Sequence, residues 1–235
     1  MNFKNFLNFI PKKRNIILHV RLKQFKKKNN DYKNLSQSLI LYFKKNFKII
    51  LIPSFTYSFC KKKKINLKTS ASEVGKFSEE IRKTQKNYRT LDPIFSFINF
   101  DNRLKVKKKL SKNSFDDDSI FKEIYKKKFL IINIGLEEIV SSQFHKIEFD
   151  NNVPYRYNKL FKGRINNQKI SYNYFVRDKN YSFNRKKILK DLLKEKIVKE
   201  KTYEKIKVRY FDIWSLTKYL NKRIKQDNYY LVNKN

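Results

Sequence analysis

Three side chains in one short segment have the types and spacing that acid–base chemistry requires. Ser142 lies three residues before His145, and Glu148 lies three residues after it. On a helix, residues three apart share one face, so the imidazole would have a hydroxyl and a carboxylate as neighbours. A carboxylate can orient an imidazole and fix its tautomer, which leaves the second ring nitrogen free to move a proton. The chain has only two histidines, so this placement carries weight.

Several kinds of site use a histidine in such a setting. A nucleophilic serine triad would suit the residue types, but Ser142 lacks the glycines of a nucleophile elbow. A zinc site would need more ligands than two distant histidines offer. A general base that acts on an incoming substrate amine needs only one accessible imidazole whose tautomer is held by a carboxylate. The alternative is an ordinary polar position on a helix, which is the more frequent role of a single histidine taken alone.

Hydroxyl side chains follow an apolar segment that is typical of a buried strand. The segment 47–52 is rich in isoleucine and leucine and is followed by Pro53. Ser54, Thr56 and Ser58 then alternate with aromatic residues, which would place the three hydroxyls on one side of the chain. Ligands of α/β sheets bind at the carboxyl ends of strands, so these hydroxyls could grip a polar chain such as an amide-bearing cofactor arm. A hydroxyl-rich strand that continues into a loop explains the same spacing.

Two further positions combine a charge or an imidazole with a strand. Arg89 precedes a predicted strand at 93–100, where it could bind a phosphate or hold a loop through Asp92. We favour the structural ion pair, because Asp92-Pro93 is also a turn signal. His19 ends a predicted strand in an apolar setting, where packing is more frequent than catalysis. A glycine-rich phosphate loop is excluded, because the chain has three glycines and no Walker or dinucleotide pattern.

Apolar strands alternate with amphipathic helices along the chain, which predicts a layered α/β fold. The late segment 169–176 alternates as an antiparallel strand does, so we expect a mixed sheet. No repeat or linker marks a boundary, and we expect a single domain over residues 1–235 with its core at about 15–226. We expect strands at 16–20, 47–52, 93–100 and 129–135. We expect helices at 35–43, 188–198 and 215–224 and around His145. Three further helices have identifiable starts or faces: one at 74–81 after a capping box at Ser70 and Glu73, a short basic one capped by Asp101 that reaches Leu110, and one from Ser119 with Ile120, Ile124 and Tyr125 inward.

Basic residues outnumber acidic ones by 57 to 21, which gives a net charge of +36. Such a charge makes nucleic acid the first partner to consider. The lysines are spread along the whole chain, however, and accompany the Asn, Ile, Phe and Tyr residues of A/T-rich codons. We therefore interpret most of the charge as solvated surface with an unspecific attraction for anions. An apolar fraction of 40% with 16% aromatic residues supports a packed core and excludes a disordered chain.

The compartment is indicated by three absences in the sequence. Cys60 is the only cysteine, so an internal disulfide is excluded. The amino-terminal segment 2–10 is too short and polar for a secretory signal, and no apolar run approaches the length of a membrane span. We therefore expect a cytoplasmic protein.

Six characteristic blocks of sequence occur in order over most of the chain. They are Ile-Pro-Ser-Phe-Thr-Tyr-Ser-Phe-Cys (52–60), Ser-Glu-Val-Gly-Lys-Phe-Ser-Glu (72–79), Arg-Thr-Leu-Asp-Pro-Ile-Phe-Ser-Phe (89–97), Asp-Ser-Ile-Phe (118–121), Ser-Gln-Phe-His-Lys-Ile-Glu (142–148) and Val-Pro-Tyr-Arg-Tyr (153–157). The series resembles the aminoglycoside 3-N-acetyltransferase family, also called antibiotic N-acetyltransferases. The resemblance implies a three-layer α/β/α domain with a mixed sheet, acetyl-coenzyme A as acyl donor, and an amino group of an amino sugar as acceptor.

The resemblance also assigns roles to individual residues. It implies that His145 is the catalytic histidine, that Glu148 is its acidic neighbour, and that Ser142 is the hydroxyl ahead of it. It further implies coenzyme contacts from His19, Arg21, Ser54, Thr56 and Ser58. We also expect acceptor contacts from Tyr57 and Asp92, and no metal.

The chain departs from the family pattern at three places. Val20 and Arg21 replace the serines of the His-Ser-Ser sequence that usually ends the first strand, and the glycine pair of the next loop is missing. Asp92 stands where family members often have histidine, and it could hold a cationic acceptor. Two alternatives to an active enzyme stay open: a basic nucleic-acid-binding protein, supported by the charge and the interleaved aromatic residues, and a degenerate, partner-binding member of the family.

The positive charge also bears on the acceptor. A polycationic antibiotic would be repelled by a chain with a net charge of +36, whereas a nucleotide-linked amino sugar would be attracted. Antibiotic modification stays an alternative, and a homodimer is a further expectation for the assembly.

Overall fold

The structure is a computed structural model that describes residues 7–25, 31–85, 88–106 and 109–235. Within these ranges, a central sheet contains six strands in the order β4-β2-β1-β5-β10-β9. The neighbours β2, β1 and β5 are parallel, whereas β4, β10 and β9 pair antiparallel, so the sheet is mixed as expected. The segment 169–176, expected to make it mixed, lies instead in a separate three-stranded sheet. The strand bounds are Ile16–Val20 for β1, Ile50–Pro53 for β2, Phe97–Asn99 for β4, Leu130–Ile134 for β5, Val198–Tyr203 for β9 and Ile206–Asp212 for β10.

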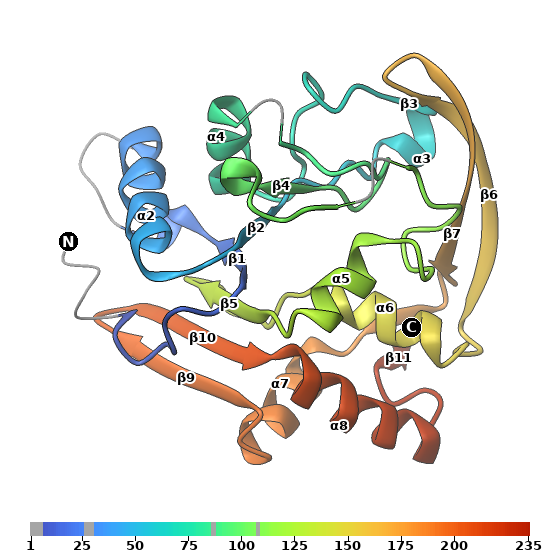
Figure 1. Ribbon diagram of the computed structural model, residues 1–235. Helices are drawn as coiled ribbons and strands as arrows, with labels where there is room; N and C mark the ends of the chain where they lie inside the picture. Colours follow the sequence, from blue (N-terminus) through green and yellow to red (C-terminus); the bar gives the residue numbers. More distant parts are fainter. Residues whose placement is uncertain (1–6, 26–30, 86–87, 107–108) are drawn as a thin grey trace.

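Both faces of the sheet are covered, which explains why its central strands are continuous apolar runs. Successive residues of β1 pack on opposite faces of the sheet: Ile16 lies in the hydrophobic core on one face, and Ile17 lies in the core on the other. Figure 1 shows α2 and α4 on one side of the sheet and α5, α6 and α8 on the other. The three-layer α/β/α architecture is thereby confirmed. The helices are α2 (Tyr32–Asn46), α4 (Lys76–Thr84), α5 (Ile120–Lys126), α6 (Gln143–Asp150), α7 (Arg185–Lys194) and α8 (Ile213–Gln226).

A long hairpin stands at one end of the molecule, outside the central sheet. Strands β6 (Arg156–Ile165) and β7 (Gln168–Arg177) pair along their whole length (Figure 1). The turn between them, Asn166-Asn167, has positive φ at both residues, as a two-residue hairpin turn of this hand requires. A Cβ at Gly163 would collide with the backbone of Lys63, so the close pairing of β3 (Lys64–Ile65) with β6 requires glycine there.

Short elements complete the chain. They are a 3-10 turn at Leu22–Gln24, α3 at Phe59–Lys62, a 3-10 turn at Phe100–Asn102, and the paired strands β8 (Tyr181–Phe183) and β11 (Val232–Lys234). Buried Leu7 and Leu231 show that packed residues extend beyond the expected core limits. Among the described helices, none has both the length and the apolar character that a membrane span needs.

The expected capping box at Ser70 and Glu73 is wrong. Helix α4 begins only at Lys76, because the Ser70 hydroxyl accepts from the Asn66 N–H at 2.9 Å and the Glu73 carboxylate accepts from the Ser58 N–H at 3.0 Å. Both capping side chains are therefore used by loops that precede the helix.

The basic helix expected from Asp101 to Leu110 is also wrong. Asp101 sits in a 3-10 turn with a φ of 53°, and its carboxylate pairs with Lys44 at 2.8 Å. Residues 107–108 of this prediction lie outside the described part. Tyr125, expected to face inward from α5, is 38% exposed because its ring stacks on Trp214 at 5.6 Å.

Candidate active site

A cavity of about 230 Å³ lies at the carboxyl ends of β1, β2 and β5. His19 and Val20 from β1 and Pro53 from β2 contribute to its wall, together with the loop after β5 and the start of α6. This is where open α/β sheets place their ligands, because the loops that follow parallel strands diverge there. His145, from the first turn of α6, lines the same cavity.

The predicted pair of His145 and Glu148 is formed. The Nδ1 atom of His145 lies 3.0 Å from Oε2 of Glu148, three residues later on the same helix face. The histidine side chain is 23% exposed, whereas the glutamate side chain is fully buried. The imidazole therefore reaches the cavity while its carboxylate partner stays behind it.

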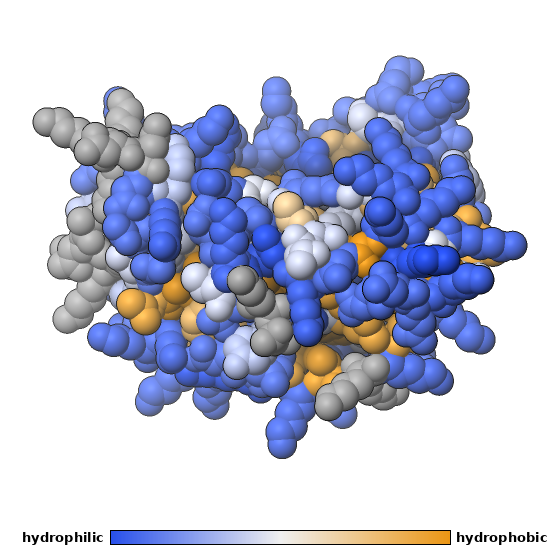
Figure 2. Space-filling model, turned by 90° about the horizontal axis from the view of Figure 1, so that it is seen from above, coloured by the Kyte–Doolittle hydropathy of each residue, from blue (hydrophilic) through white to orange (hydrophobic). Residues whose placement is uncertain are grey.

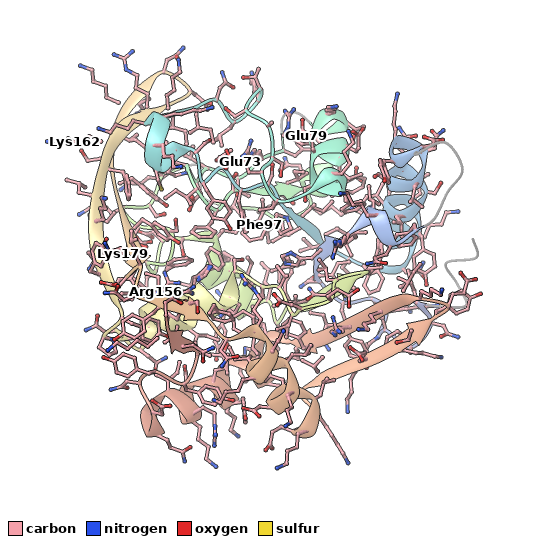
Figure 3. The ribbon with its side chains drawn as sticks, turned by 180° about the vertical axis from the view of Figure 1, so that it is seen from behind. Glu73, Glu79, Phe97, Arg156, Lys162 and Lys179 are labelled. Atoms are coloured by element: carbon pink, nitrogen blue, oxygen red, sulfur yellow. The ribbon has the colours of Figure 1, made fainter. Side chains whose placement is uncertain are left out.

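Two arginines from the open end of the hairpin complete the cluster. Arg156 places Nη2 at 2.6 Å from Oε2 of Glu148, and Arg177 places Nη2 at 3.2 Å from Oε1. Arg156 also donates to the Phe175 carbonyl at 2.6 Å, which anchors it to the hairpin. Figure 3 shows Arg156 where the hairpin begins, beside α6. The carboxylate thus has the hydrogen-bond and charge partners that a buried ion needs.

The contacts of the Nδ1 atom are compatible with two tautomers of His145. Nη2 of Arg156 lies 2.8 Å from His145 Nδ1, so the ring nitrogen has both a donor and a carboxylate close by. A lone pair on Nδ1 would point at the oxygen of Glu148, whereas an N–H there donates to that oxygen, and Arg156 can then donate to the carboxylate as well. With the proton on Nδ1, the ring donates to the ionised carboxylate and Nε2 is the free base; with the proton on Nε2, Nδ1 accepts from Nη2 of Arg156 instead. The proposed function uses the first of these tautomers.

The surroundings shift the titration of both groups. Burial lowers the pKa of His145 from 6.5 to about 4; Arg156 and Arg177 act in the same direction, and the hydrogen bond that His145 donates to Glu148 opposes them. Burial raises the pKa of Glu148, but its bond to His145 and the charge of Arg156 outweigh burial and hold that pKa at about 2. At neutral pH the pair is therefore a neutral imidazole beside an ionised carboxylate.

These shifts predict that the free energy of unfolding falls as the pH is lowered from 7 to 4. Burial also lowers the pKa of His19 from 6.5 to about 4. Between the unfolded pKa of 6.5 and the folded pKa of about 4, each histidine is protonated in the unfolded chain but not in the folded one. The contribution of the two histidines to stability therefore declines below pH 6.5 and levels off near 4. The loss corresponds to about 3 kcal/mol for each histidine. Urea unfolding monitored by circular dichroism at several pH values would measure it.

A variant with His19→Gln and His145→Gln provides the control for this pH dependence. Its stability should change less over the same interval, because both histidine contributions are gone and those of carboxylates with a lowered pKa, such as Glu79 and Glu137, remain. An equal decline in both proteins would contradict the assignment to the histidines.

Ser142 is brought to the cavity as the spacing predicts. It immediately precedes α6, is 4% exposed, and lines the cavity together with His145. Its carbonyl accepts from the N–H of His145 at 3.0 Å, which starts the helix and holds the two residues together. Ser142 and His145 thus line the same cavity, and Glu148 lies behind the imidazole.

The structure does not bring the three hydroxyls after β2 to this cavity. Phe55 and Tyr57 line the cavity instead. Thr56 and Ser58 line a separate hollow beside the hairpin, and the Thr56 hydroxyl donates to the Pro93 carbonyl at 2.8 Å. Ser54 is fully buried, and neither cavity includes it.

The structure corrects the expected pair of Arg89 and Asp92. Within the described ranges Arg89 has no carboxylate partner; it donates to the Ser70 carbonyl at 2.8 Å and to the carbonyl of Ser54, and burial lowers its pKa to about 10. Asp92 accepts from the hydroxyl of Tyr172 at 2.8 Å. Its other carboxylate oxygen accepts from two backbone N–H groups of its own turn, so Asp92 does not reach the His145 cavity.

The remaining predicted residues divide between the cavity and the surface. His19 and Tyr57 line the cavity, and Tyr57 is 42% exposed. Arg21 is exposed and does not line it. In the part of the chain that the structure describes, no group of three His, Cys, Asp or Glu side chains could hold a metal ion.

Sequence reasoning missed the arginines of the site. Arg156 lies in the block Val-Pro-Tyr-Arg-Tyr, to which no role was assigned, and Arg177 directly follows the predicted strand segment 169–176. Arg185 and Phe183, which also line the cavity, gave no signal in a chain so rich in lysine and arginine. The alternation that identifies β7 could have located Arg177 at its end, but not its partner.

Comparisons with known proteins agree with this geometry. The sequence model of the family described as aminoglycoside 3-N-acetyltransferase matches residues 17–225. The chain is similar in structure to apo aminoglycoside acetyltransferase AAC(3)-IVa, with a TM-score of 0.74 and 14% identity over 96% of this chain and 87% of that one. None of the curated protein sequences that were compared matches it.

Two other solved structures are similar to the same extent. YokD from Bacillus subtilis has a TM-score of 0.72 and 15% identity, covering 95% of this chain and 97% of that one. AAC-IIIb in a binary complex with CoASH has a TM-score of 0.74 and 10% identity, covering 94% of this chain and 93% of that one. At such identities the structures show the fold, and the family match covers most of the sequence: the chain belongs to the aminoglycoside 3-N-acetyltransferase family.

Proposed function

We propose that this chain transfers the acetyl group of acetyl-coenzyme A to the amino group of an amino sugar, with His145 as general base. The observation that carries the proposal is the bond of 3.0 Å between His145 and Glu148 at the wall of a cavity, in a chain of an N-acetyltransferase family. A solvated imidazole outside any cavity would not have supported it.

The donor is inferred from the fold and from the shape of the site. The similar enzyme AAC-IIIb has been solved with CoASH. In this chain the cavity wall combines apolar side chains such as Val20, Phe55 and Val140 with the polar start of α6. That combination suits the arm of a thioester, whose chain is largely apolar and whose carbonyl needs a hydrogen-bond donor.

The chemical step needs one proton acceptor and no covalent intermediate on the protein. The acceptor nitrogen attacks the thioester carbonyl, and Nε2 of His145 takes the proton that this nitrogen sheds as the C–N bond forms. The C–S bond then breaks, and the imidazolium returns the proton to the leaving thiolate. With a pKa of about 4, the ring is in its base form at neutral pH before the step begins.

Glu148 and the arginines position the base in this proposal. The carboxylate of Glu148 accepts the hydrogen bond from Nδ1–H and stabilises the imidazolium as it forms. It stays ionised because Arg156 and Arg177 lower its pKa. Ser142 supplies a hydroxyl for the carbonyl oxygen, whose negative charge grows in the transition state. Tyr57, on the exposed side of the cavity, is placed to contact the acceptor.

The direct test mixes the full chain with acetyl-coenzyme A and a panel of amino sugars that includes an aminoglycoside. Thiol release followed with a chromogenic disulfide should depend on the acceptor, and mass spectrometry should show one acetyl group added to its amine. Thiol release at the same rate without acceptor would indicate hydrolysis only. Random oligonucleotides bound in a salt-dependent way, with no binding of coenzyme A, would favour the nucleic-acid alternative.

A further inference from the structure

The cavity wall has an unusual composition for a site that would bind a polycation. None of the described residues that line it is an aspartate or a glutamate, and one, Arg185, carries a permanent positive charge. The two histidines of the wall are neutral at pH 7, since burial lowers both pKa values to about 4. A ligand in this cavity therefore meets a neutral or positive wall.

Carboxylates near the cavity have other partners. Glu148 stands behind His145 and is paired with two arginines. Glu73 accepts from the Ser58 N–H at 3.0 Å and lines the separate hollow on the other side of the chain. Glu138 lies 3.6 Å from the Nε atom of Arg185, and both side chains are about half exposed. None of these groups offers an unshared negative charge to the interior of the cavity.

Arg185 begins α7 and stands beside an aromatic ring of the cavity wall. Its guanidinium lies 5.6 Å from the centre of the Phe183 ring, and that of Arg177 lies 5.1 Å from the same centre. The side chain of Arg185 is 47% exposed, and the weak contact with Glu138 involves only its Nε. Its terminal nitrogens can therefore turn to a bound anion, which a guanidinium holds through two parallel hydrogen bonds.

We propose that the acceptor of this chain is an amino sugar that carries a phosphate or similar anionic group, and that Arg185 binds this group at the rim of the His145 cavity. The inference rests on the proposed function, because it names the substrate class of that same site. It makes Arg185 a specificity-determining residue and excludes a polycationic aminoglycoside as the preferred acceptor.

The net charge of the whole chain points in the same direction. Figure 2 shows a face of the molecule covered mostly by hydrophilic side chains, and the chain as a whole carries +36. A cation with several ammonium groups would approach against this field and then find no carboxylate on the wall to pair with, which leaves its charges costly to desolvate. An anionic amino sugar would be attracted at a distance and paired on arrival.

Arg185 could also bind the phosphates of coenzyme A, so the test must distinguish an anionic group of the donor from one of the acceptor. Isothermal titration of the full chain would compare glucosamine 6-phosphate, glucosamine and the polycation sisomicin as acceptor probes, and coenzyme A and pantetheine as donor probes. The variants are Arg185→Gln and, as a control with the same loss of charge, Lys190→Gln. Lys190 is exposed on α7 and does not line the cavity.

The expected result is that glucosamine 6-phosphate binds about tenfold or more tightly than glucosamine, and that sisomicin binds more weakly than both. Arg185→Gln should reduce the preference for the phosphate to near unity, and Lys190→Gln should keep it. Tighter binding of sisomicin would overturn the proposal. So would an Arg185→Gln effect confined to coenzyme A and absent with pantetheine, or equal effects of the two variants.

These titrations contain no acetyl group, so they fail separately from the proposed reaction. Thiol release with none of the acceptors would refute the proposed function, while the ranking of affinities would still decide the charge of the ligand. Thiol release with sisomicin at a higher kcat/KM than with glucosamine 6-phosphate would confirm a transferase and refute the anionic acceptor.

Discussion

Replacing His145 with asparagine should lower kcat/KM for acetyl transfer by about 10²–10⁴-fold. Asparagine can place its amide where Nδ1 was, so it can still donate to Glu148, but it has no group at the position of Nε2. The variant therefore removes the proton acceptor and keeps the contact that positions α6. Steady-state thiol release with saturating acetyl-coenzyme A would measure the loss.

A structural effect of this substitution is separable from the loss of the base. Coenzyme A should bind the variant with nearly the wild-type affinity in a titration. Added imidazole should restore part of the rate with increasing concentration, because a small base can occupy the vacated space. A variant that keeps more than a tenth of the activity would contradict the role of His145.

Glu148→Gln should destabilise the protein by about 3–5 kcal/mol, which is the usual cost of removing one partner from a buried ion pair. The substitution leaves Arg156, which is 2% exposed, and Arg177, which is 20% exposed, without their carboxylate. Their charges would have to be buried unpaired or drawn toward water, and either change pulls at the open end of the hairpin. Urea unfolding followed by circular dichroism would give the difference in free energy.

Asp150→Asn is the matched control for Glu148→Gln. Asp150 belongs to the same helix and pairs with Lys146, but its side chain is 41% exposed, so its loss should cost less than about 1 kcal/mol. The double variant Glu148→Gln with Arg177→Gln should be more stable than Glu148→Gln alone, because one unpaired charge is gone. If the two single variants lost the same free energy of unfolding, burial would not explain the contribution of Glu148 to stability.

The parts of the fold that the sequence predicts are those determined by local pattern. Ile16–Val20 and Leu130–Ile134 form strands where continuous apolar runs predict them, since both faces of the sheet are covered. The pairing of His145 with Glu148 was also predictable, because residues three apart on a helix must lie together. The resemblance of the sequence blocks suggested the catalytic role of His145. The family match confirms that the chain belongs to the aminoglycoside 3-N-acetyltransferase family.

The rest depends on contacts between distant segments. Arg156 and Arg177 both reach Glu148 because a hairpin of two ten-residue strands brings Arg177 back beside Arg156. The hydroxyls of Thr56 and Ser58 alternate as expected, yet which side faces the cavity depends on how the 54–58 segment packs. Asp101 has the residue type of a helix cap, but its carboxylate pairs with Lys44 across the sheet edge instead. The local spacing of apolar and polar residues does not specify these contacts between distant segments.

The hairpin register has a consequence for the order in which the protein assembles. Arg156 and Arg177 are direct partners across the two strands. Like charges opposite each other repel, so the hairpin on its own would fray at its open end while its Asn166-Asn167 turn stays closed. Only the arrival of a negative charge from α6 removes the repulsion. Closure of this end is therefore tied to the docking of α6, and the free imidazole nitrogen is presented only in a chain whose long-range folding is finished.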